Sequence, residues 1–213
     1  MPELTGQFRS AAEELFGDRL DLAVRFGEHL ASTGIEWGLL GPREVGRLWE
    51  RHILNCAVVG DLLVDGALVA DVGSGAGLPG VALALARPDC QFILIEPLER
   101  RVAWLDMVVE DLRLDNVDVV RARSEQVVGN VVVDVVTARA VSALKSLVPI
   151  TVPLLQGSGE LLAIKGRSAA DETTSAAKVL KKHKAKAPVI ESVGGDLLPE
   201  PTTVVRVAVG AQH

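Results

Sequence analysis

A glycine-rich turn that follows an apolar segment is the feature of this chain best suited to chemistry. The segment reads Val69-Ala70-Asp71-Val72-Gly73-Ser74-Gly75-Ala76-Gly77-Leu78-Pro79-Gly80. Gly73, Gly75 and Gly77 permit a tight turn with positive φ, and they let a ligand approach the backbone without meeting a Cβ. Pro79 suits the first turn of a following helix, where its missing N–H costs nothing. The pattern predicts a strand, a turn and a helix that together bind a nucleotide-like cofactor.

The spacing of the glycines distinguishes between two cofactors that use such a turn. The dinucleotide fingerprint G-x-G-x-x-G would require glycine at position 78, where this chain has Leu78. The G-x-G-x-G spacing from Gly73 to Gly77 instead favours S-adenosylmethionine. Glu96 ends the second predicted strand, where an acidic residue can accept hydrogen bonds from ribose hydroxyls. A dinucleotide enzyme, a structural turn without a ligand and a solvated Glu96 remain as alternatives.

Short apolar runs alternate with helical segments from residue 67 onward. The predicted strands span Leu68–Asp71, Gln91–Ile95, Val117–Val120, Val132–Thr137, Glu160–Ile164, Val189–Val193 and Thr203–Val209. The predicted helices span Pro79–Arg87, Leu98–Leu112, Ala143–Leu155 and Ser168–Lys182. This alternation predicts an α/β, Rossmann-like fold with a mostly parallel sheet covered by helices on both faces. Because only a loop separates the last two strands, the final strand is predicted to run antiparallel.

The N-terminal part of the chain has a different pattern. Apolar residues recur there at helical spacing between residues 7 and 60, which predicts two or three helices. We therefore expect a helical N-terminal extension over residues 1–65 and a cofactor-binding domain over residues 66–213.

Composition limits the classes of protein that this chain can belong to. Its 213 residues, 48% of them apolar, suffice for one domain with a substantial core. No apolar run approaches the roughly 18 residues needed to cross a bilayer, and Met1-Pro2-Glu3 does not begin a secretory signal, so we expect a cytoplasmic protein. Cys56 and Cys90 lack metal-ligand spacing, which predicts buried free thiols and no metal site. The net charge of −6 argues against non-specific coating of nucleic acid.

Several motifs, in the same order along the chain, resemble those of one known family. They are the glycine-rich turn, Ile95-Glu96-Pro97-Leu98-Glu99-Arg100-Arg101, Arg123-Ser124-Glu125, Arg139-Ala140 and Leu162-Ala163-Ile164-Lys165-Gly166, preceded by Arg47-Leu48-Trp49-Glu50-Arg51-His52-Ile53-Leu54-Asn55-Cys56. Together they resemble the bacterial small-subunit (16S) ribosomal RNA guanine-N7 methyltransferases, also called glucose-inhibited division protein B. The ordered set is far more specific than the glycine turn alone.

The resemblance implies roles for residues at matching positions. Gly73 and Leu78 would frame the methionine and adenosine portions of S-adenosylmethionine, and Glu96 would hold its ribose. Ser124 and Glu125 would contact the adenine region. Arg139 would line the pocket beside the transferred methyl group.

Three positions depart from the usual family pattern. Ser124 replaces a common alanine, and Ala138 replaces a common serine. Asn55 stands where many members carry aspartate, which argues against a catalytic carboxylate there.

Three residues are candidates for catalysis, each with a simpler alternative. Arg139 comes at the end of the fourth predicted strand, at the sheet edge where ligands bind in open α/β folds, although it could form a surface ion pair. Lys165 follows the fifth strand and could hold a phosphate or a base edge, or simply be solvated. His52 could be catalytic or a helix-face histidine, and Trp104 is most simply a core residue.

One dense group of basic residues lies near the end of the last predicted helix. We call it the lysine cluster, and it contains Lys178, Lys181, Lys182, His183, Lys184 and Lys186. The negative end of the helix dipole explains this placement, and contact with RNA phosphates is the alternative. Arg43, Arg47 and Arg51 would form a second basic surface if the N-terminal helices pack beside the cofactor.

The residues predict an S-adenosylmethionine-dependent methyltransferase, and the resemblance implies that it methylates guanine N7 in 16S ribosomal RNA, near the decoding site. Guanine N7 carries a lone pair and no proton, so direct in-line attack on the methyl group needs no general base. The expected partner is small-subunit RNA or the 30S particle, and the expected state is a monomer. A methyltransferase for another RNA, a protein or a small molecule, and a non-catalytic binding module, remain as alternatives.

Overall fold

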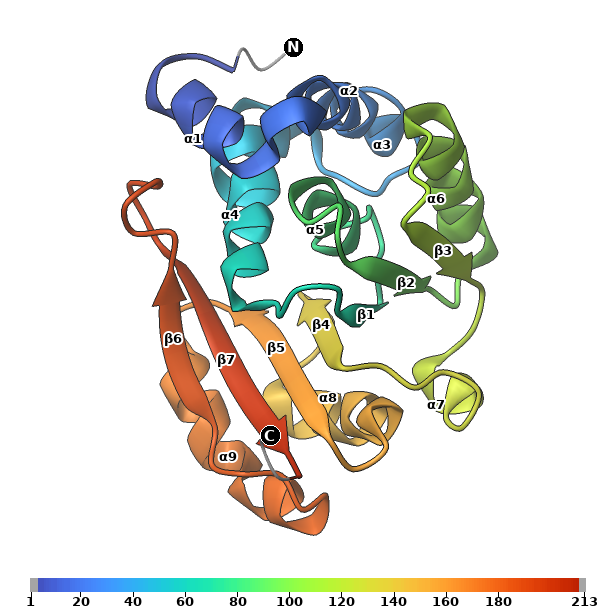
Figure 1. The fold of residues 1–213 in the computed structure, drawn as a ribbon, viewed down its shortest axis with the longest axis vertical. Coiled ribbons are helices and arrows are strands. Elements are labelled where there is room, and N and C mark those ends of the chain that lie inside the picture. The colour runs from blue at the N-terminus through green and yellow to red at the C-terminus, as the bar shows by residue number, and fades with distance from the viewer. Residues whose placement is uncertain (1–3, 211–213) are drawn as a thin grey trace.

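Seven strands form a single sheet in the computed structural model, in the order β3-β2-β1-β4-β5-β7-β6 (Figure 1). The structure describes residues 4–210, so residues 1–3 and 211–213 of the two expected domain ranges lie outside the described residues. The strands are β1 Leu68–Val72, β2 Gln91–Ile95, β3 Val117–Val120, β4 Val135–Arg139, β5 Gly159–Lys165, β6 Val189–Val193 and β7 Thr202–Val209. Strands β1 to β5 pair in parallel, and β7 is antiparallel to both β5 and β6. The predicted mostly parallel sheet with an antiparallel last strand is confirmed.

The boundary of β4 differs from the prediction. We expected Val132–Thr137, whereas the strand covers Val135–Arg139. Its ladder begins where Val135 pairs with Val69 of β1, while the Val133 N–H donates to the Leu154 carbonyl outside the sheet. The apolar run therefore begins before the strand does, because Val133 has no hydrogen bond to a neighbouring strand through its N–H.

Helices cover both faces of the sheet. The α-helices are α1 Gly6–Phe16, α2 Leu20–Ala31, α3 Thr33–Glu36, α4 Leu54–Ala57, α5 Gly80–Ala86, α6 Glu99–Leu112, α7 Ser124–Val127, α8 Leu144–Thr151 and α9 Ala169–Lys182. Short 3-10 segments are η1 Gly17–Arg19, η2 Pro42–Arg47, η4 Val58–Leu62 and η5 Val152–Leu155, and η3 Trp49–Ile53 is a π-helical turn. One face packs against the N-terminal helices with α5 and α6, and the other packs against α8 and α9 (Figure 1).

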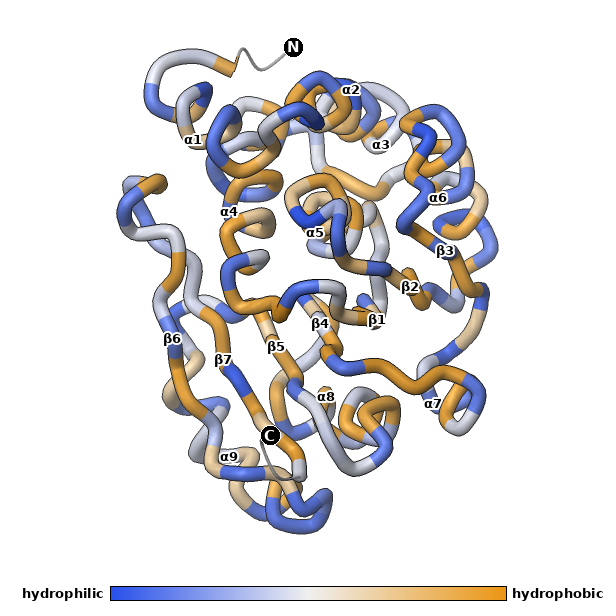
Figure 2. The backbone as a smooth tube through the Cα atoms, in the orientation of Figure 1, coloured by the Kyte–Doolittle hydropathy of each residue, from blue (hydrophilic) through white to orange (hydrophobic). Residues whose placement is uncertain are grey.

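Side-chain alternation along the strands supplies both cores. In β5, Leu162 and Ile164 face the N-terminal helices, while Leu161 and Ala163 face α8 and α9. In Figure 2 the central strands and α4 are largely hydrophobic, and hydrophilic positions gather on the outer surfaces of helices and in loops. Trp104 is fully buried and its indole N–H donates to Thr33, which confirms it as a core residue.

The N-terminal segment is built from more and shorter helical pieces than the two or three predicted helices. Phe26 and Ile53 belong to the same buried cluster as Val69 of β1 and Phe92 of β2. The N-terminal helices thus share a core with the sheet and are held beside it.

The chain order places a crevice between β1 and β4. From β1 the chain continues outward to β2 and β3, and it then returns to β4 on the opposite side of β1. Loops that leave neighbouring strands in opposite directions open a crevice at the carboxyl ends of those strands. The glycine turn after β1 and Arg139 at the end of β4 meet there. Among residues 4–210, no helix has the length and apolarity to span a membrane.

Candidate active site

The glycine turn requires its glycines for both conformation and space. Gly73, Gly75 and Gly77 have φ values of 75°, 56° and 73°. A Cβ at Gly77 would lie 2.6 Å from Val81 Cγ2, so a side chain there would collide with α5. The Gly73 N–H donates to the Ile95 carbonyl at 2.8 Å, which ties the turn to β2. Pro79 is the N-cap of α5, one position earlier than the first-turn position that we expected.

A buried carboxylate beneath the turn was not among the predicted site residues. Asp71 is fully buried, and its side chain accepts hydrogen bonds from the Gly80 N–H at 3.0 Å and the Thr137 hydroxyl at 3.2 Å. Burial raises the pKa of Asp71 to about 6, although these hydrogen bonds oppose the shift. Asp71 thereby links β1, β4 and the start of α5. An acidic residue inside an otherwise apolar strand is the sequence signal that could have identified it.

Glu96 lies directly beside the glycine turn, where its predicted role requires it. Its carboxylate is 1% exposed and accepts hydrogen bonds from the Gly75 N–H at 3.1 Å and the Leu98 N–H at 3.0 Å. Arg101 Nη1 is 3.6 Å from the same carboxylate. The surrounding groups therefore hold Glu96 in a fixed orientation at the end of β2.

An apolar recess continues from the glycine turn toward α7. It has a volume of about 160 Å³, and Gly73, Ile95, Ser124, Glu125 and Val141 contribute to its lining. Ser124 is buried, and its hydroxyl donates to the Glu125 carboxylate at 3.3 Å. A flat, mostly apolar group with polar edges, such as a purine, suits this lining.

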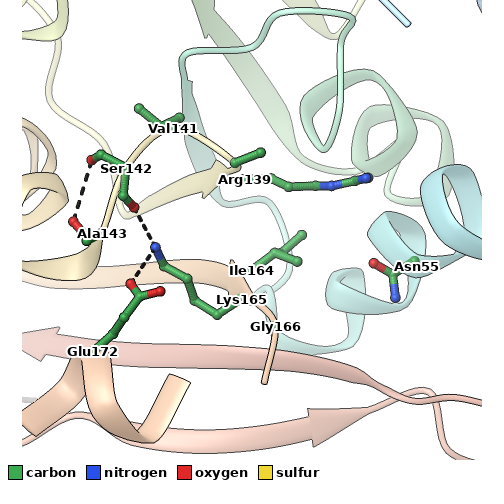
Figure 3. A pocket seen from close by; sticks show the side chains of 10 residues that line it. Asn55, Arg139, Val141, Ser142, Ala143, Ile164, Lys165, Gly166 and Glu172 are labelled. Carbon is green, nitrogen blue, oxygen red and sulfur yellow. Dashed lines mark hydrogen bonds and ion pairs between the residues drawn. The ribbon is translucent and has the colours of Figure 1, made fainter. Parts of the chain in front are cut away.

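Two further cavities meet at Arg139. One of about 220 Å³ lies over the turn and is lined by Gly73, Gly75, Leu78, His52 and Arg139, among others. The other, of about 490 Å³, extends past Arg139 to Lys165, Asn55 and Glu172 (Figure 3). Ala140, which follows Arg139 and lines both cavities, has a positive φ of 55°, an uncommon conformation for a residue other than glycine.

Arg139 is anchored by residues from the N-terminal helices. Its Nη2 is 2.6 Å from His52 Nδ1, and its Nη1 donates to Cys56 Sγ at 2.9 Å. Figure 3 shows the side chain extending from the end of β4 toward the helices that carry Asn55. The N-terminal segment therefore forms one wall of the crevice and fixes the position of Arg139 within it.

His52 occupies the π-helical turn η3, a kind of turn that often occurs at functional sites. Its Nε2 is 2.9 Å from a carboxylate oxygen of Glu44. Burial lowers the pKa of His52, and the positive charge of Arg139 lowers it further, while the hydrogen bond to Glu44 acts in the opposite direction. The imidazole is therefore kept neutral at pH 7 and held at both of its nitrogens. Glu44 and Cys56 were not predicted as site residues.

Lys165 lines the large cavity, but its ammonium group is already engaged. Nζ lies 2.9 Å from Glu172 and donates to the Ser142 carbonyl at 2.6 Å (Figure 3). Burial alone would raise the pKa of Glu172, but hydrogen bonds from Lys165, the Leu144 N–H and Ser168 together lower it. Lys165 and Arg139 thus line the same cavity, but Lys165 is directed to Ser142 and Glu172, whereas Arg139 is directed to His52 and Cys56.

The two basic surfaces lie in different places. Lys165 ends β5 beside the crevice. From there α9 runs back over about 21 Å to the end of the sheet at which β5 begins. Ala185, inside the lysine cluster, pairs with Val209, whose other neighbour is Gly159 at the start of β5. The lysine cluster is therefore remote from the crevice. Arg43, Arg47 and Arg51, which we call the rim arginines, are exposed on η2 and η3 beside it.

Solved structures of other methyltransferases share the fold. A ribosomal protein L11 methylase from Lactobacillus delbrueckii subsp. bulgaricus matches with a TM-score of 0.57 and 13% identity, over 76% of this chain and 79% of that one. The M. jannaschii TYW2 structure in complex with AdoMet matches with a TM-score of 0.55 and 17% identity, over 74% of each chain. At such low identity these similarities establish the fold alone.

Similarity in sequence is much closer. The ribosomal RNA small subunit methyltransferase G of Pseudarthrobacter chlorophenolicus is 59% identical over 98% of this chain and 97% of its own length. The protein of the same name from Renibacterium salmoninarum is 59% identical over the full length of both chains. The family model described as GidB, rRNA small subunit methyltransferase G, matches residues 19–198. The chain therefore belongs to the GidB family of rRNA small subunit methyltransferases.

Proposed function

We propose that this protein transfers a methyl group from S-adenosylmethionine to N7 of a guanosine in 16S ribosomal RNA, near the decoding site. The observation that carries the proposal is the meeting of three elements at one crevice. They are the glycine turn with Glu96 beside it, the apolar recess beyond it, and Arg139 at the mouth of the large cavity. Membership of the GidB family supports the choice of ribosomal RNA as substrate.

The residues of the crevice fit S-adenosylmethionine. When bound, this cofactor supplies a methyl group made electrophilic by the sulfonium that carries it. Gly73, Gly75 and Gly77 would let the backbone approach the ligand, and Leu78 would pack against it. Glu96 would accept hydrogen bonds from the ribose hydroxyls. These would partly replace the hydrogen bond that it now accepts from the Gly75 N–H.

The apolar recess would take the adenine ring. Ser124 and Glu125 provide the polar edge of this recess, while Ile95 and Val141 provide apolar walls. A dinucleotide would have to place a second nucleotide in the space that Arg139 and His52 line. Because both cofactors carry adenine, the choice of S-adenosylmethionine is supported by the glycine spacing and by membership of the GidB family.

Arg139 would orient the guanine. A guanidinium has five N–H donors, and the hydrogen bonds of Arg139 to His52 and Cys56 use at most three of them. The others can donate to guanine O6, which lies beside N7 on the same edge of the base. Most of the rate increase would then come from alignment, since good positioning can supply roughly 7 to 11 kcal/mol.

His52 and Lys165 have supporting roles in this proposal. A neutral imidazole with both nitrogens engaged is not available as a base, and N7 attack requires none. Lys165 would hold the turn at Ser142 on the wall of the large cavity, and it could bind a phosphate next to the target base only by exchanging its ion pair with Glu172 for that contact.

The rim arginines are the proposed docking surface for RNA. They are exposed beside the crevice, whereas the lysine cluster lies about a helix length away. Arg51 is 3.7 Å from Glu200, and Arg43 is exposed on η2. Because every proposed site residue belongs to one chain, a monomer would suffice. A ribosomal substrate implies a cytoplasmic protein.

Transfer of a labelled methyl group to 30S particles and to free 16S RNA tests the proposal directly. The product is mapped by chemical cleavage at N7-methylguanine. We expect label at a single guanosine, with no label when the target position is changed to adenosine. Label on another atom or another RNA would redirect the proposal to a different methyltransferase activity. Binding of the cofactor without transfer to any ribosomal substrate would point to a binding module.

A further inference from the structure

A chain of three side chains leads from the protein surface to the crevice. Glu44 on η2 contacts His52 on η3 through Nε2 at 2.9 Å, and His52 contacts Arg139 of β4 through Nδ1 at 2.6 Å. A guanidinium can only donate, so Nδ1 must be the acceptor and must carry no proton. In the neutral ring Nε2 then carries the proton, and this N–H donates a hydrogen bond to the Glu44 carboxylate.

The other anchors of Arg139 are weaker. Cys56 Sγ is a poor acceptor, and the His52 carbonyl is 3.5 Å from Nη1. The orientation of the guanidinium therefore depends mainly on His52 Nδ1. That nitrogen can face Arg139 only while the ring keeps its present orientation, and the bond from Nε2–H to Glu44 opposes ring rotation.

We propose that Glu44 is a positioning residue for Arg139: by holding the imidazole of His52, it fixes the guanidinium over the crevice. This proposal rests on the proposed function, because the orientation of Arg139 affects turnover only if Arg139 orients the target base. The Glu44 side chain is 42% exposed, whereas that of His52 is 12% exposed. Glu44, a residue at the surface, thus fixes the orientation of Arg139 through His52, without contacting Arg139 itself.

Substitution of Glu44 tests the role of its oxygen atoms. Glu44→Ala should lower kcat about tenfold, the loss expected for one hydrogen bond that orients a reacting group, and should leave the KM for S-adenosylmethionine within about twofold. Glu44→Gln keeps an oxygen that can accept from Nε2–H, so kcat should stay within about threefold of wild type. Glu50→Ala on η3 is the matched control and should behave as wild type. A Glu44→Gln loss as large as that of Glu44→Ala, or a Glu44→Ala activity equal to the control, would overturn the proposal.

A double-mutant cycle tests whether Glu44 acts through His52. In His52→Asn the amide oxygen can replace Nδ1 as the acceptor for Arg139, but the shorter side chain cannot reach Glu44. Adding Glu44→Ala to His52→Asn should therefore cost less than about twofold in kcat. A full tenfold loss in that background would show that Glu44 acts independently of His52.

A spectroscopic measurement on the free protein separates this proposal from the proposed function. Nitrogen-15 NMR at pH 7.5 should show His52 neutral and protonated at Nε2, with the signal identified by its absence in His52→Asn. In Glu44→Ala the two ring nitrogens should shift toward the average of both tautomers. A wild-type imidazolium, a proton on Nδ1, or an unchanged Glu44→Ala spectrum would overturn the proposal. If the expected spectra appear while the mapped assay finds no N7 methylation, the proposed function fails and the positioning of Arg139 by Glu44 stands.

Discussion

The buried carboxylate of Asp71 should make the protein less stable at neutral pH than it would be with an amide. Its pKa is about 6 in the folded protein against an ordinary value of 3.8. The folded state therefore binds more protons than the unfolded state between these values, and stability falls as pH rises through that range. Above pH 6 the full cost of ionisation is present, which amounts to about 3 kcal/mol for a shift of about two pKa units.

Asp71→Asn removes this cost while keeping the shape of the side chain. The amide oxygen can still accept from the Gly80 N–H, and its NH₂ group can donate to Thr137. Relative to wild type, the free energy of unfolding should rise by about 3 kcal/mol at pH 7.5 and by only about 1 kcal/mol at pH 4.5, where the wild-type carboxyl is largely protonated. The difference of about 2 kcal/mol between the two pH values is the quantity to test, because effects of shape cancel in it.

Urea unfolding at both pH values, followed by circular dichroism, measures these free energies. Asp118→Asn, an exposed change on β3, is the control and should alter stability by less than about 0.5 kcal/mol at either pH. An Asp71→Asn effect that is the same at pH 4.5 and pH 7.5 would refute the reasoning. It would mean that the hydrogen bonds from the turn and from β4 fully compensate the buried charge.

Three further predictions concern the crevice and the RNA surface. Arg139→Ala should reduce methyl transfer at least about a hundredfold without loss of fold, because alignment of the base is lost; turnover near wild type would remove it from the site. Glu96→Gln should weaken S-adenosylmethionine binding about tenfold by calorimetry, because a charged acceptor becomes neutral, and unchanged affinity would exclude the ribose role. Exchanging two rim arginines for alanine should reduce the slope of log RNA affinity against log salt concentration by up to about 1.8. Exchanging two residues of the lysine cluster should leave this slope unchanged. The reverse result would move the RNA-binding surface to the lysine cluster.

Local sequence signals predicted the central elements well. Strands β2 and β3 have the predicted bounds, because each is a short apolar run closed by polar or turn residues on both sides. The segment expected as one helix over Ala143–Leu155 is instead α8 followed by the 3-10 segment η5. Pro153 contributes to the change, because a proline has no N–H to donate to the carbonyl four residues earlier, although Val152 before it keeps right-handed α geometry.

The contacts within the site were less accessible to sequence reasoning. Gly73 and Glu96 could be placed because each follows a strand, and parallel strands bring their carboxyl ends to one edge. The bond between Glu44 and His52 depends on how the 3-10 segment η2 and the π-helical turn η3 follow one another. No periodicity in the sequence encodes that geometry, which arises from packing the N-terminal segment against the sheet.

The state of His52 bears on the kind of chemistry that the crevice can support. A reaction that removes a proton would benefit from a base with a free lone pair, yet both nitrogens of this imidazole are used in holding neighbours. The carboxylates at the glycine turn are likewise engaged: Glu96 is bound to two backbone N–H groups, and Asp71 is fully buried and accepts hydrogen bonds from the Gly80 N–H and the Thr137 hydroxyl. A nucleophile that already carries an exposed lone pair, as guanine N7 does, is the substrate that such a rigid crevice would serve best. The same rigidity predicts that loosening Arg139 through Glu44 should affect turnover more than cofactor affinity.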